Sequence, residues 1–185
     1  MSAVVARLAQ TADLPALVTL VNGVYRGPEA AARAWTTEAN IIDGQRCDLE
    51  MLQTLHQPPL GFFLLVEEPD TGRIAAACHL KDCGAAIAET GMLSVALHRQ
   101  GQGLGSLLLH RAETEAQHQW QSSIMRLWVI DGRVELLAFY ARRGYRATGV
   151  HQPFPSDPRY GIPRTPGLRL LALEKPLGRG RSPER

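Results

Sequence analysis

The feature that most constrains this chain is a run of alternating glycines between an apolar segment and a helical pattern. Residues 89–97 have the composition of a strand, residues 100–105 read Gln-Gly-Gln-Gly-Leu-Gly, and an amphipathic helical pattern follows. The first amides of a helix have no internal partner and lie at the positive end of the helix dipole, so an anion gains several hydrogen bonds there. Because glycines let that backbone approach closely, the segment predicts a phosphate-binding loop.

Two common nucleotide-binding motifs do not fit this spacing. A Rossmann fingerprint, G-x-G-x-x-G, would require glycine at Ser106 if it began at Gly101, and at Leu108 if it began at Gly103. An NTPase loop would end in Gly-Lys-Ser or Gly-Lys-Thr, and neither tripeptide occurs in the chain. A tight connection without a ligand is the remaining alternative, but three alternating glycines cost backbone entropy that a plain turn does not require.

Length and composition predict one ordinary globular domain. The chain has 185 residues, of which 45% are hydrophobic and 21% charged, enough for one core and too few for a second independent domain. We expect a single domain over residues 1–177 and a flexible tail over residues 178–185, where Gly, Ser and Pro surround a few arginines. A net charge of +2 is too small to predict a nucleic-acid partner.

The cysteines and the apolar runs indicate a compartment. The cysteines are odd in number and form no Cys-x-x-Cys pair, so a disulfide framework is disfavoured; they are Cys47, Cys78 and Cys83. The first residues lack a signal-peptide pattern, and no apolar stretch is long enough to span a bilayer. These patterns predict a cytoplasmic protein without a membrane partner. Neither the histidines nor the cysteines have metal-ligand spacing, so no metal is expected.

Hydrophobic periodicity and turn residues predict a mixed sheet with helices on its faces. Strands are expected over residues 4–9, 61–67, 74–80, 89–97, 124–130, 145–150 and 168–174. Helical patterns cover residues 14–21, 27–57 with interruptions, 104–116 and 135–143. The turn at residues 69–72 predicts an antiparallel hairpin. The order β-α-α-β-β-β-α-β-α-β-β indicates an α/β (α+β) fold.

The glycine loop resembles the signature of the GNAT superfamily of N-acetyltransferases. Gln100, Gly103 and Gly105 match its Q/R-x-x-G-x-G/A pattern, and Leu93-x-Val95 stands where those proteins place the preceding strand. Neither nucleotide motif considered above accounts for this spacing.

A second motif makes the resemblance more specific. Residues 139–145 read Phe-Tyr-Ala-Arg-Arg-Gly-Tyr, which is similar to the F-Y-x-x-x-G-F/Y helix end of the same superfamily. The two motifs occur in the family's order and in matching local structure, and together they cover residues 89–145. The preceding β-α-α-β-β order is similar to the family's amino-terminal half, so the resemblance implies a GNAT-like acyl-CoA N-acyltransferase fold.

The resemblance implies acetyl-CoA as cosubstrate and a primary amine of a small molecule, amino acid or peptide as acceptor. In that family the pantetheine arm lies between two splayed strands and hydrogen-bonds like an added strand. The residues it assigns to the cofactor are Leu93, Ser94, Val95, Gln100, Gly101, Gln102, Gly103, Leu104, Gly105 and Ser106. The amine attacks directly in a ternary complex, without a covalent enzyme intermediate, and the amide of Leu93 or Val95 could stabilise the oxyanion.

Two residues are candidates for proton transfer. Tyr140 matches the family's tyrosine, which donates a proton to the departing thiolate, although a tyrosine here could equally fill space in the core. Glu89 lies eleven positions before Gln100, the spacing of the general base in the histone acetyltransferase branch. A carboxylate at this strand could take a proton from the amine or could point to solvent, and both interpretations stay open.

One departure from the family concerns Arg133. Many relatives carry Asn at this position, six residues before the Phe-Tyr pair, where it aids cofactor binding. An arginine could still reach a cofactor phosphate or the sheet edge, so Arg133 is kept as a cofactor-binding candidate. His79 and His98 are expected to be ordinary surface or strand residues.

The acceptor side is expected from residues 35–38 and from the proline-rich loop around Phe154 and Tyr160, by analogy with the superfamily. Three acidic residues could attract a cationic substrate or could be solvated helix charges, namely Glu38, Asp43 and Glu50. The runner-up to an enzyme is a non-catalytic acyl-CoA-binding or interaction module with the same fold, and a homodimer is left open.

Overall fold

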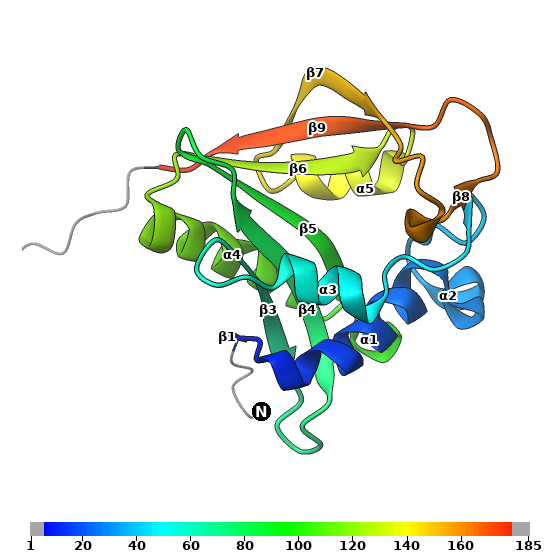
Figure 1. The fold of residues 1–185 in the computed structure, drawn as a ribbon, viewed down its shortest axis with the longest axis horizontal. Coiled ribbons are helices and arrows are strands. Elements are labelled where there is room, and N and C mark those ends of the chain that lie inside the picture. Colours follow the sequence, from blue (N-terminus) through cyan, green and yellow to red (C-terminus); the bar gives the residue numbers. More distant parts are fainter. Residues whose placement is uncertain (1–5, 179–185) are drawn as a thin grey trace, which may run out of the picture.

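A seven-stranded mixed sheet organises the chain, of which this computed structural model describes residues 6–178 (Figure 1). Across the sheet the strands are β1 (Ala6–Leu8), β3 (Gly61–Glu67), β4 (Ile74–Asp82), β5 (Ile87–Val95), β6 (Ile124–Ile130), β9 (Arg169–Pro176) and β7 (Arg146–Pro153). Neighbouring strands are antiparallel except β5 and β6, which pair in parallel. A separate ribbon pairs β2 (Ile42–Asp43) with β8 (Ile162–Pro163).

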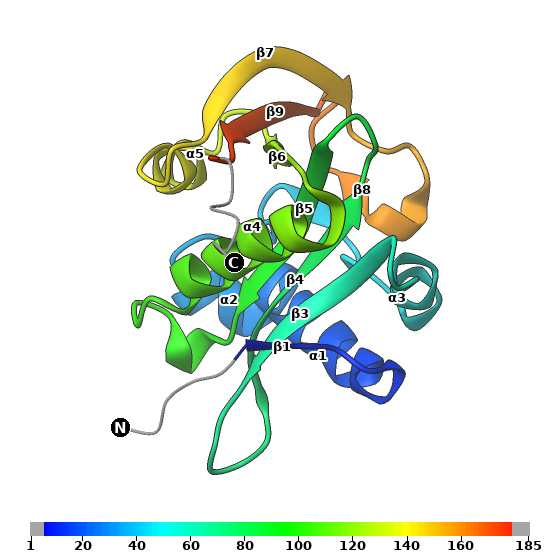
Figure 2. The same cartoon turned by 90° about the vertical axis from the view of Figure 1, so that its left-hand side faces the viewer.

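Helices cover both faces of the sheet. They are α1 (Leu14–Arg26), α2 (Pro28–Arg33), α3 (Leu49–Leu55), α4 (Leu104–Trp120) and α5 (Val134–Ala141). The core divides accordingly, since α4 and α5 bury their apolar residues on one face, and α1 and α3 on the other (Figure 2). Successive residues of β3 alternate between these two clusters, with Leu64 in the first and Leu65 in the second, as expected for a strand buried on both faces.

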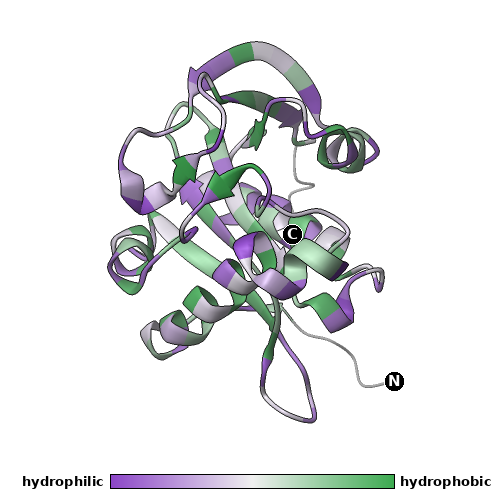
Figure 3. Cartoon of the chain, turned by 90° about the vertical axis from the view of Figure 1, so that its right-hand side faces the viewer, coloured by the Kyte–Doolittle hydropathy of each residue, from purple (hydrophilic) through white to green (hydrophobic). Residues whose placement is uncertain are grey.

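Hydropathy follows this layering. Hydrophobic segments gather on the central strands, whereas the turn between β3 and β4 is hydrophilic (Figure 3). Leu64 and Leu65 are each no more than 1% exposed, and burying such a side chain contributes about 1.5–3 kcal/mol. The sheet centre is therefore the rigid frame on which the loops at its edge are held.

The expected order of elements and the mixed sheet are confirmed, with two additions. The interrupted helical region resolves into α2 and α3, and the β2–β8 ribbon was not predicted. The strand expected to reach residue 97 ends at Val95 because Leu97–Arg99 forms a short 3-10 helix. Val4 and Val5, expected in the first strand, lie outside the described residues.

Several side chains of α4 depart from a simple amphipathic pattern. Leu107 is apolar but 39% exposed, whereas Glu113 is charged but only 7% exposed. The Glu113 carboxylate accepts hydrogen bonds from the Tyr145 hydroxyl at 3.0 Å and from Lys175 at 2.7 Å. These partners offset the cost of burying the charge, which the helical pattern alone does not reveal.

The end of the described chain is attached to α4 and β6. Leu177 is buried, and its amide donates to the Ser123 carbonyl at 2.7 Å. The predicted tail lies outside the described residues from Arg179 onward. No helix in residues 6–178 combines the length and apolarity needed to cross a membrane. The three cysteines are free, two of them buried.

The sheet opens where β5 leaves β6. Their parallel pairing stops at Glu89 and Arg126, and beyond this point the two strands diverge (Figure 1). A register shift against β4 at Ala77/His79 places Met92 at a positive φ of 52°. Such a bulge bends its strand and increases the local twist. The opening of the sheet therefore coincides with a local distortion of β5.

A buried histidine on β4 makes stability depend on pH. His79 is 6% exposed, and its Nε2 lies 3.1 Å from the Leu55 carbonyl oxygen. Desolvation lowers the pKa of His79 to about 4 from its ordinary value of 6.5. Because the unfolded chain binds the proton more tightly, this residue's contribution is complete above pH 6.5 and is lost as pH falls toward 4.

We therefore expect the wild type to lose about 2 kcal/mol more unfolding free energy than His79→Gln between pH 7 and pH 4.5. Urea unfolding of both proteins at the two pH values measures the difference. Parallel losses in the two proteins would show that His79 does not carry this pH dependence.

Candidate active site

Two cavities meet at the opening between β5 and β6. The first has a volume of about 400 Å³ and extends toward the start of α4, and the second has about 500 Å³ and extends toward β8 and the proline-rich loop. Four residues line both cavities, namely Tyr25, Arg133, Leu136 and Tyr140. We call these four residues the junction. A group entering from either side reaches the same side chains there.

The glycine loop forms one end of the first cavity. Gly103 precedes α4 with a φ of 82°, and Gly101 has a φ of 77°. A Cβ at either glycine would meet no atom within 4 Å, so the space beside the backbone is open. Within residues 6–178, the amides of residues 101–105 donate to no protein acceptor. This is the arrangement that binds an anion at a helix start.

Most of the expected cofactor residues line this cavity. They are Leu93, Val95, Gln100, Gly101, Gly103, Leu104, Gly105, Ser106 and Arg133. Two expected residues do not. Ser94 is fully buried, with its hydroxyl donating to the Met92 carbonyl, because alternate residues of a strand face opposite sides. The Gln102 side chain is exposed and bonds to Arg99 and to the His98 carbonyl.

The edge of β5 presents backbone groups to the opening. The Ala96 amide donates to the Ala75 carbonyl on the β4 side, so the peptide groups of Leu93 and Val95 face away from β4. Their carbonyls accept from the Tyr25 hydroxyl at 3.4 Å and from the Gln100 side-chain amide at 3.2 Å. Side chains therefore satisfy positions that an added strand would occupy.

The charged residues that line the first cavity are all cations. Its lining includes four arginines and no carboxylate, the arginines being Arg99, Arg133, Arg142 and Arg143. Arg143 donates to the Ser106 hydroxyl at 3.0 Å and lies 3.5 Å from the centre of the Phe139 ring. This surplus of positive charge suits a ligand with several phosphates. Sequence reasoning missed Arg99, Arg142 and Arg143, although the last two stand inside the Phe-Tyr motif at positions where the pattern allows any residue.

Residues 35–37, expected on the acceptor side, line the first cavity instead. The Trp35 amide donates to the Gln100 side chain at 3.2 Å, and its ring centre lies 5.6 Å from that of Phe139. This segment therefore lies against the glycine loop. Phe154 and Tyr160, also expected on the acceptor side, line the second cavity.

Tyr140 occupies the junction. It is 7% exposed on α5 and packs edge-on against Phe139. Desolvation, followed by the neighbouring Tyr25, raises the pKa of Tyr140 well above its ordinary value. The phenol is therefore protonated at physiological pH and can donate a hydrogen bond to a group in either cavity.

Glu89 lies on the wall of the second cavity. One carboxylate oxygen is 2.8 Å from the Lys81 ammonium, and the other accepts from the Trp128 indole at 3.0 Å. The side chain is 20% exposed. Glu89 thus neither points freely to solvent nor stands alone in the cavity, and these two partners fix its orientation.

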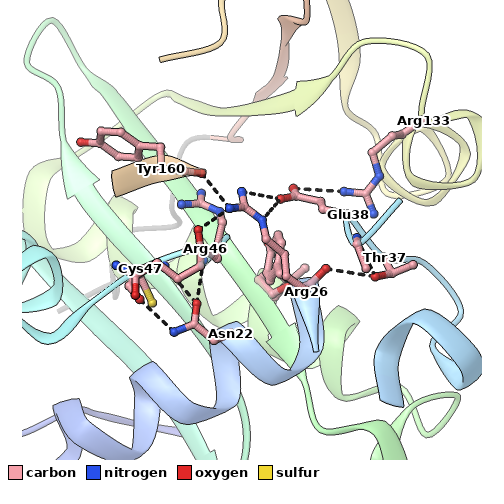
Figure 4. Close-up of polar contacts among 12 residues, drawn as sticks. Asn22, Arg26, Thr37, Glu38, Arg46, Cys47, Arg133 and Tyr160 are labelled. Atoms are coloured by element: carbon pink, nitrogen blue, oxygen red, sulfur yellow. Dashed lines mark hydrogen bonds and ion pairs between the residues drawn. The ribbon is translucent and has the colours of Figure 1, made fainter. Parts of the chain in front are cut away.

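A buried ion network lies beside the junction (Figure 4). The Glu38 carboxylate accepts from Arg26 at 3.0 Å and from Arg133 at 3.3 Å. Arg133 also donates to the Thr36 hydroxyl. Glu38 is 6% exposed, so it is neither a solvated helix charge nor a free attractant for a cation. Two arginines neutralise it, which burial of a carboxylate requires.

Other expected groups lie outside the cavity linings. Asp43 and Glu50 have exposed side chains that pair with Arg164 and Arg159. His98 is exposed beside Glu68. Across residues 6–178, no three His, Cys, Asp or Glu side chains gather in a way that could hold a metal ion.

Comparison with known proteins gives a family match. The sequence profile of the acetyltransferase (GNAT) family matches residues 28–145. No curated protein sequence matches the chain.

Solved structures share the fold at low identity. A putative acetyltransferase from Salmonella typhimurium, solved with its cofactor acetyl-CoA, is 19% identical, with a TM-score of 0.63 over 99% of both chains. The ribosomal-protein-S18-alanine N-acetyltransferase from Escherichia coli is 14% identical, with a TM-score of 0.68 over 99% of both chains. A GNAT-family acetyltransferase from Staphylococcus aureus is 15% identical, with a TM-score of 0.66 over 95% of this chain and 99% of that one.

The glycine loop yields a prediction with a matched control. Gly103→Leu should raise the Kd for coenzyme A at least about 10-fold, because the new side chain enters the open space beside the unbonded amides. Gly72→Leu alters another open glycine, at a φ of 67° in the β3–β4 turn. Both variants should lose about 1–2 kcal/mol of stability. Calorimetric titration measures the binding. Equal affinities of the two variants for coenzyme A would show that the glycine loop is not part of the binding site.

Proposed function

The chain belongs to the acetyltransferase (GNAT) family, and we propose that it is an acetyl-CoA-dependent N-acetyltransferase acting on a primary amine of a small molecule, amino acid or peptide. The amine attacks directly in a ternary complex. The observation that carries this proposal is the meeting of two cavities at Tyr140, one of them lined by cations and unbonded amides.

The residues of the first cavity fit coenzyme A. The amides of residues 101–105 and the four arginines offer donors and charge for its phosphates. The exposed edge of β5 at Leu93 and Val95 offers strand-like hydrogen bonds for the amides of a pantetheine arm. The Salmonella relative was solved with acetyl-CoA, which supports the same donor here. When bound, acetyl-CoA supplies the acetyl thioester.

Tyr140 is proposed as the acid. As the amine nitrogen bonds to the carbonyl carbon, the carbon–sulfur bond breaks and negative charge develops on sulfur. The protonated phenol at the junction donates its hydrogen bond, and then its proton, to that sulfur. Backbone amides of Leu93 or Val95, which face the opening, can donate to the carbonyl oxygen.

Glu89 is proposed to take the proton that the amine loses, directly or through a water. It shares the second cavity with Tyr140, so both proton-transfer groups border the space assigned to the acceptor. Lys81 and Trp128 hold its two oxygens. For this role, one of the two Glu89 oxygens must accept a further proton. Glu89 and Tyr140 carry different proton transfers, so their roles can be tested separately.

Turnover distinguishes the enzyme from a non-catalytic acyl-CoA-binding module. Thiol release from acetyl-CoA across a panel of primary amines tests the proposal. Amine-dependent release supports it, and saturable coenzyme A binding without release for any amine would favour the module. The buried Tyr140 side chain, which borders both cavities, supports catalysis.

Tyr140→Phe should lower kcat about 100-fold or more while the Kd for coenzyme A stays within about 2-fold, because only the acid is lost. Tyr145→Phe is the matched control. Its hydroxyl is also buried but bonds to Glu113, away from both cavities, so kcat should change little. Steady-state rates and calorimetric titration measure both effects, and a normal kcat in Tyr140→Phe would contradict the assignment.

Glu89→Gln should lower kcat/KM about 100-fold near neutral pH, with the deficit shrinking as pH rises and the amine loses its proton in solution. Glu174→Gln, which removes a carboxylate paired with Arg126 outside the cavities, is the control. A pH–rate profile for each variant tests the role. A deficit below about 10-fold that does not vary with pH would leave Glu89 as a positioning residue only.

A further inference from the structure

The second cavity carries more positive than negative charge, and this excess limits which acceptor it can bind. Its lining contains more cations than carboxylates; the cations are Arg46, Lys81, Arg133 and Arg159, and the carboxylates are Glu38 and Glu89. A primary amine enters as an ammonium ion near neutral pH and would meet this excess positive charge. An acceptor that carries only an amine is therefore poorly matched to the cavity.

Both carboxylates are already engaged. Glu38 is bonded to two arginines, and Glu89 to Lys81 and Trp128. Neither offers a free counter-ion for a second positive charge on the acceptor. Polyamines and other dications are consequently disfavoured.

Three of the four cations are also engaged. Lys81 pairs with Glu89, Arg133 with Glu38, and Arg159 with Asp48 at 3.0 Å. Arg46 differs, because no carboxylate in residues 6–178 lies within 4.0 Å of its side-chain nitrogens. A half-buried arginine that lines a cavity without an anionic partner has donors available for a ligand.

The position of Arg46 is fixed from two sides. Its backbone amide donates to the Asn22 side-chain oxygen at 2.7 Å, and the Asn22 amide in turn donates to the Cys47 carbonyl at 2.8 Å (Figure 4). Its guanidinium carbon lies 5.5 Å from the centre of the Tyr25 ring, and Tyr25 belongs to the junction. The Arg46 guanidinium is thus held beside the point where the two cavities meet.

We infer that Arg46 binds a carboxylate of the acceptor, so that the substrate is an amino acid with its amine directed toward Tyr140 and Glu89. This inference rests on the proposed function. A guanidinium binds a carboxylate through two parallel hydrogen bonds, which fixes orientation as well as affinity. The carboxylate also cancels the ammonium charge, so a zwitterion enters the cavity without adding net positive charge.

The rest of the wall favours an apolar side chain. Apolar residues line much of the second cavity, including Met51, Leu55, Leu127, Val129 and Phe154. Leucine is therefore a suitable probe. Leucinamide has the same side chain and amine but no carboxylate, and 3-methylbutylamine lacks the carboxyl group altogether.

The test compares thiol release with leucine, leucinamide and 3-methylbutylamine. The wild type should show the highest kcat/KM with leucine. Arg46→Gln should lower kcat/KM for leucine about 10- to 100-fold, mainly through KM, and leave the value for leucinamide within about 3-fold. Arg46→Lys, which keeps the charge but not the planar fork, should recover part of the loss.

Arg73→Gln is the control for net charge, since Arg73 lies in the turn beside β4 and lines neither cavity. It should not change the preference for leucine over leucinamide. Equal loss for leucine and leucinamide in Arg46→Gln, or equal use of both by the wild type, would overturn the inference while leaving the acetyltransferase proposal intact.

Binding provides a second readout that does not depend on turnover. Leucine should raise the melting temperature of the coenzyme A-loaded wild type. Leucinamide should cause no such increase in the wild type, and leucine should cause none in Arg46→Gln. If no amine supports thiol release, but leucine stabilises the wild type and not Arg46→Gln, only the catalytic proposal is wrong. If leucine causes no shift and supports no release, the inference about Arg46 is wrong.

Discussion

The early end of the pairing between β5 and β6 is the constraint on which the rest of the site depends. Beyond Glu89 and Arg126 the strands diverge, and the peptide groups of Leu93 and Val95 lose the neighbour they would have in a continuous sheet. An unsatisfied buried carbonyl costs about 1–3 kcal/mol. Tyr25 and Gln100 donate to these two carbonyls, so neither carbonyl is left without a donor at the opening.

A ligand arm with amide groups can replace these side-chain donors. The same opening leads in one direction to the unbonded amides before α4, and in the other to the cavity behind the junction. Both cavities therefore border one distortion in the sheet. Tyr140 belongs to both because α5 places it against the opening.

Charge separates the two sides of the junction. The first cavity has arginines and no carboxylates, as a phosphate-rich ligand requires, whereas the second has cations and carboxylates that are mostly paired. Glu38 lies between Arg26 and Arg133 and so offsets part of the positive charge near the junction. Arg46 stands out in the second cavity because its charge is not paired in the described part of the chain.

The local features of the site were predictable from the sequence. The glycine loop and the Phe-Tyr motif are contiguous, and each specifies its own strand–turn–helix or helix end. Strand alternation also explains why Ser94, although inside the motif, turns away from the cavity.

The features that depend on tertiary contacts were not predictable. Glu38 is paired with Arg133, 95 positions away, so its burial could not be inferred from a helical pattern. Residues 35–37 contact Gln100 and Phe139 through Trp35. These long-range contacts place the segment in the first cavity and not on the acceptor side, where it was expected. The β2–β8 strands are two residues each, too short to show a periodicity.

The most direct test of this arrangement of the site is a crystal structure of the protein with bound coenzyme A. We expect the pantetheine amides to hydrogen-bond to the backbone of Leu93 and Val95, displacing Tyr25 and Gln100. We also expect the thiol to lie within hydrogen-bond distance of the Tyr140 hydroxyl. Coenzyme A bound outside the opening between β5 and β6, or a thiol remote from Tyr140, would contradict it.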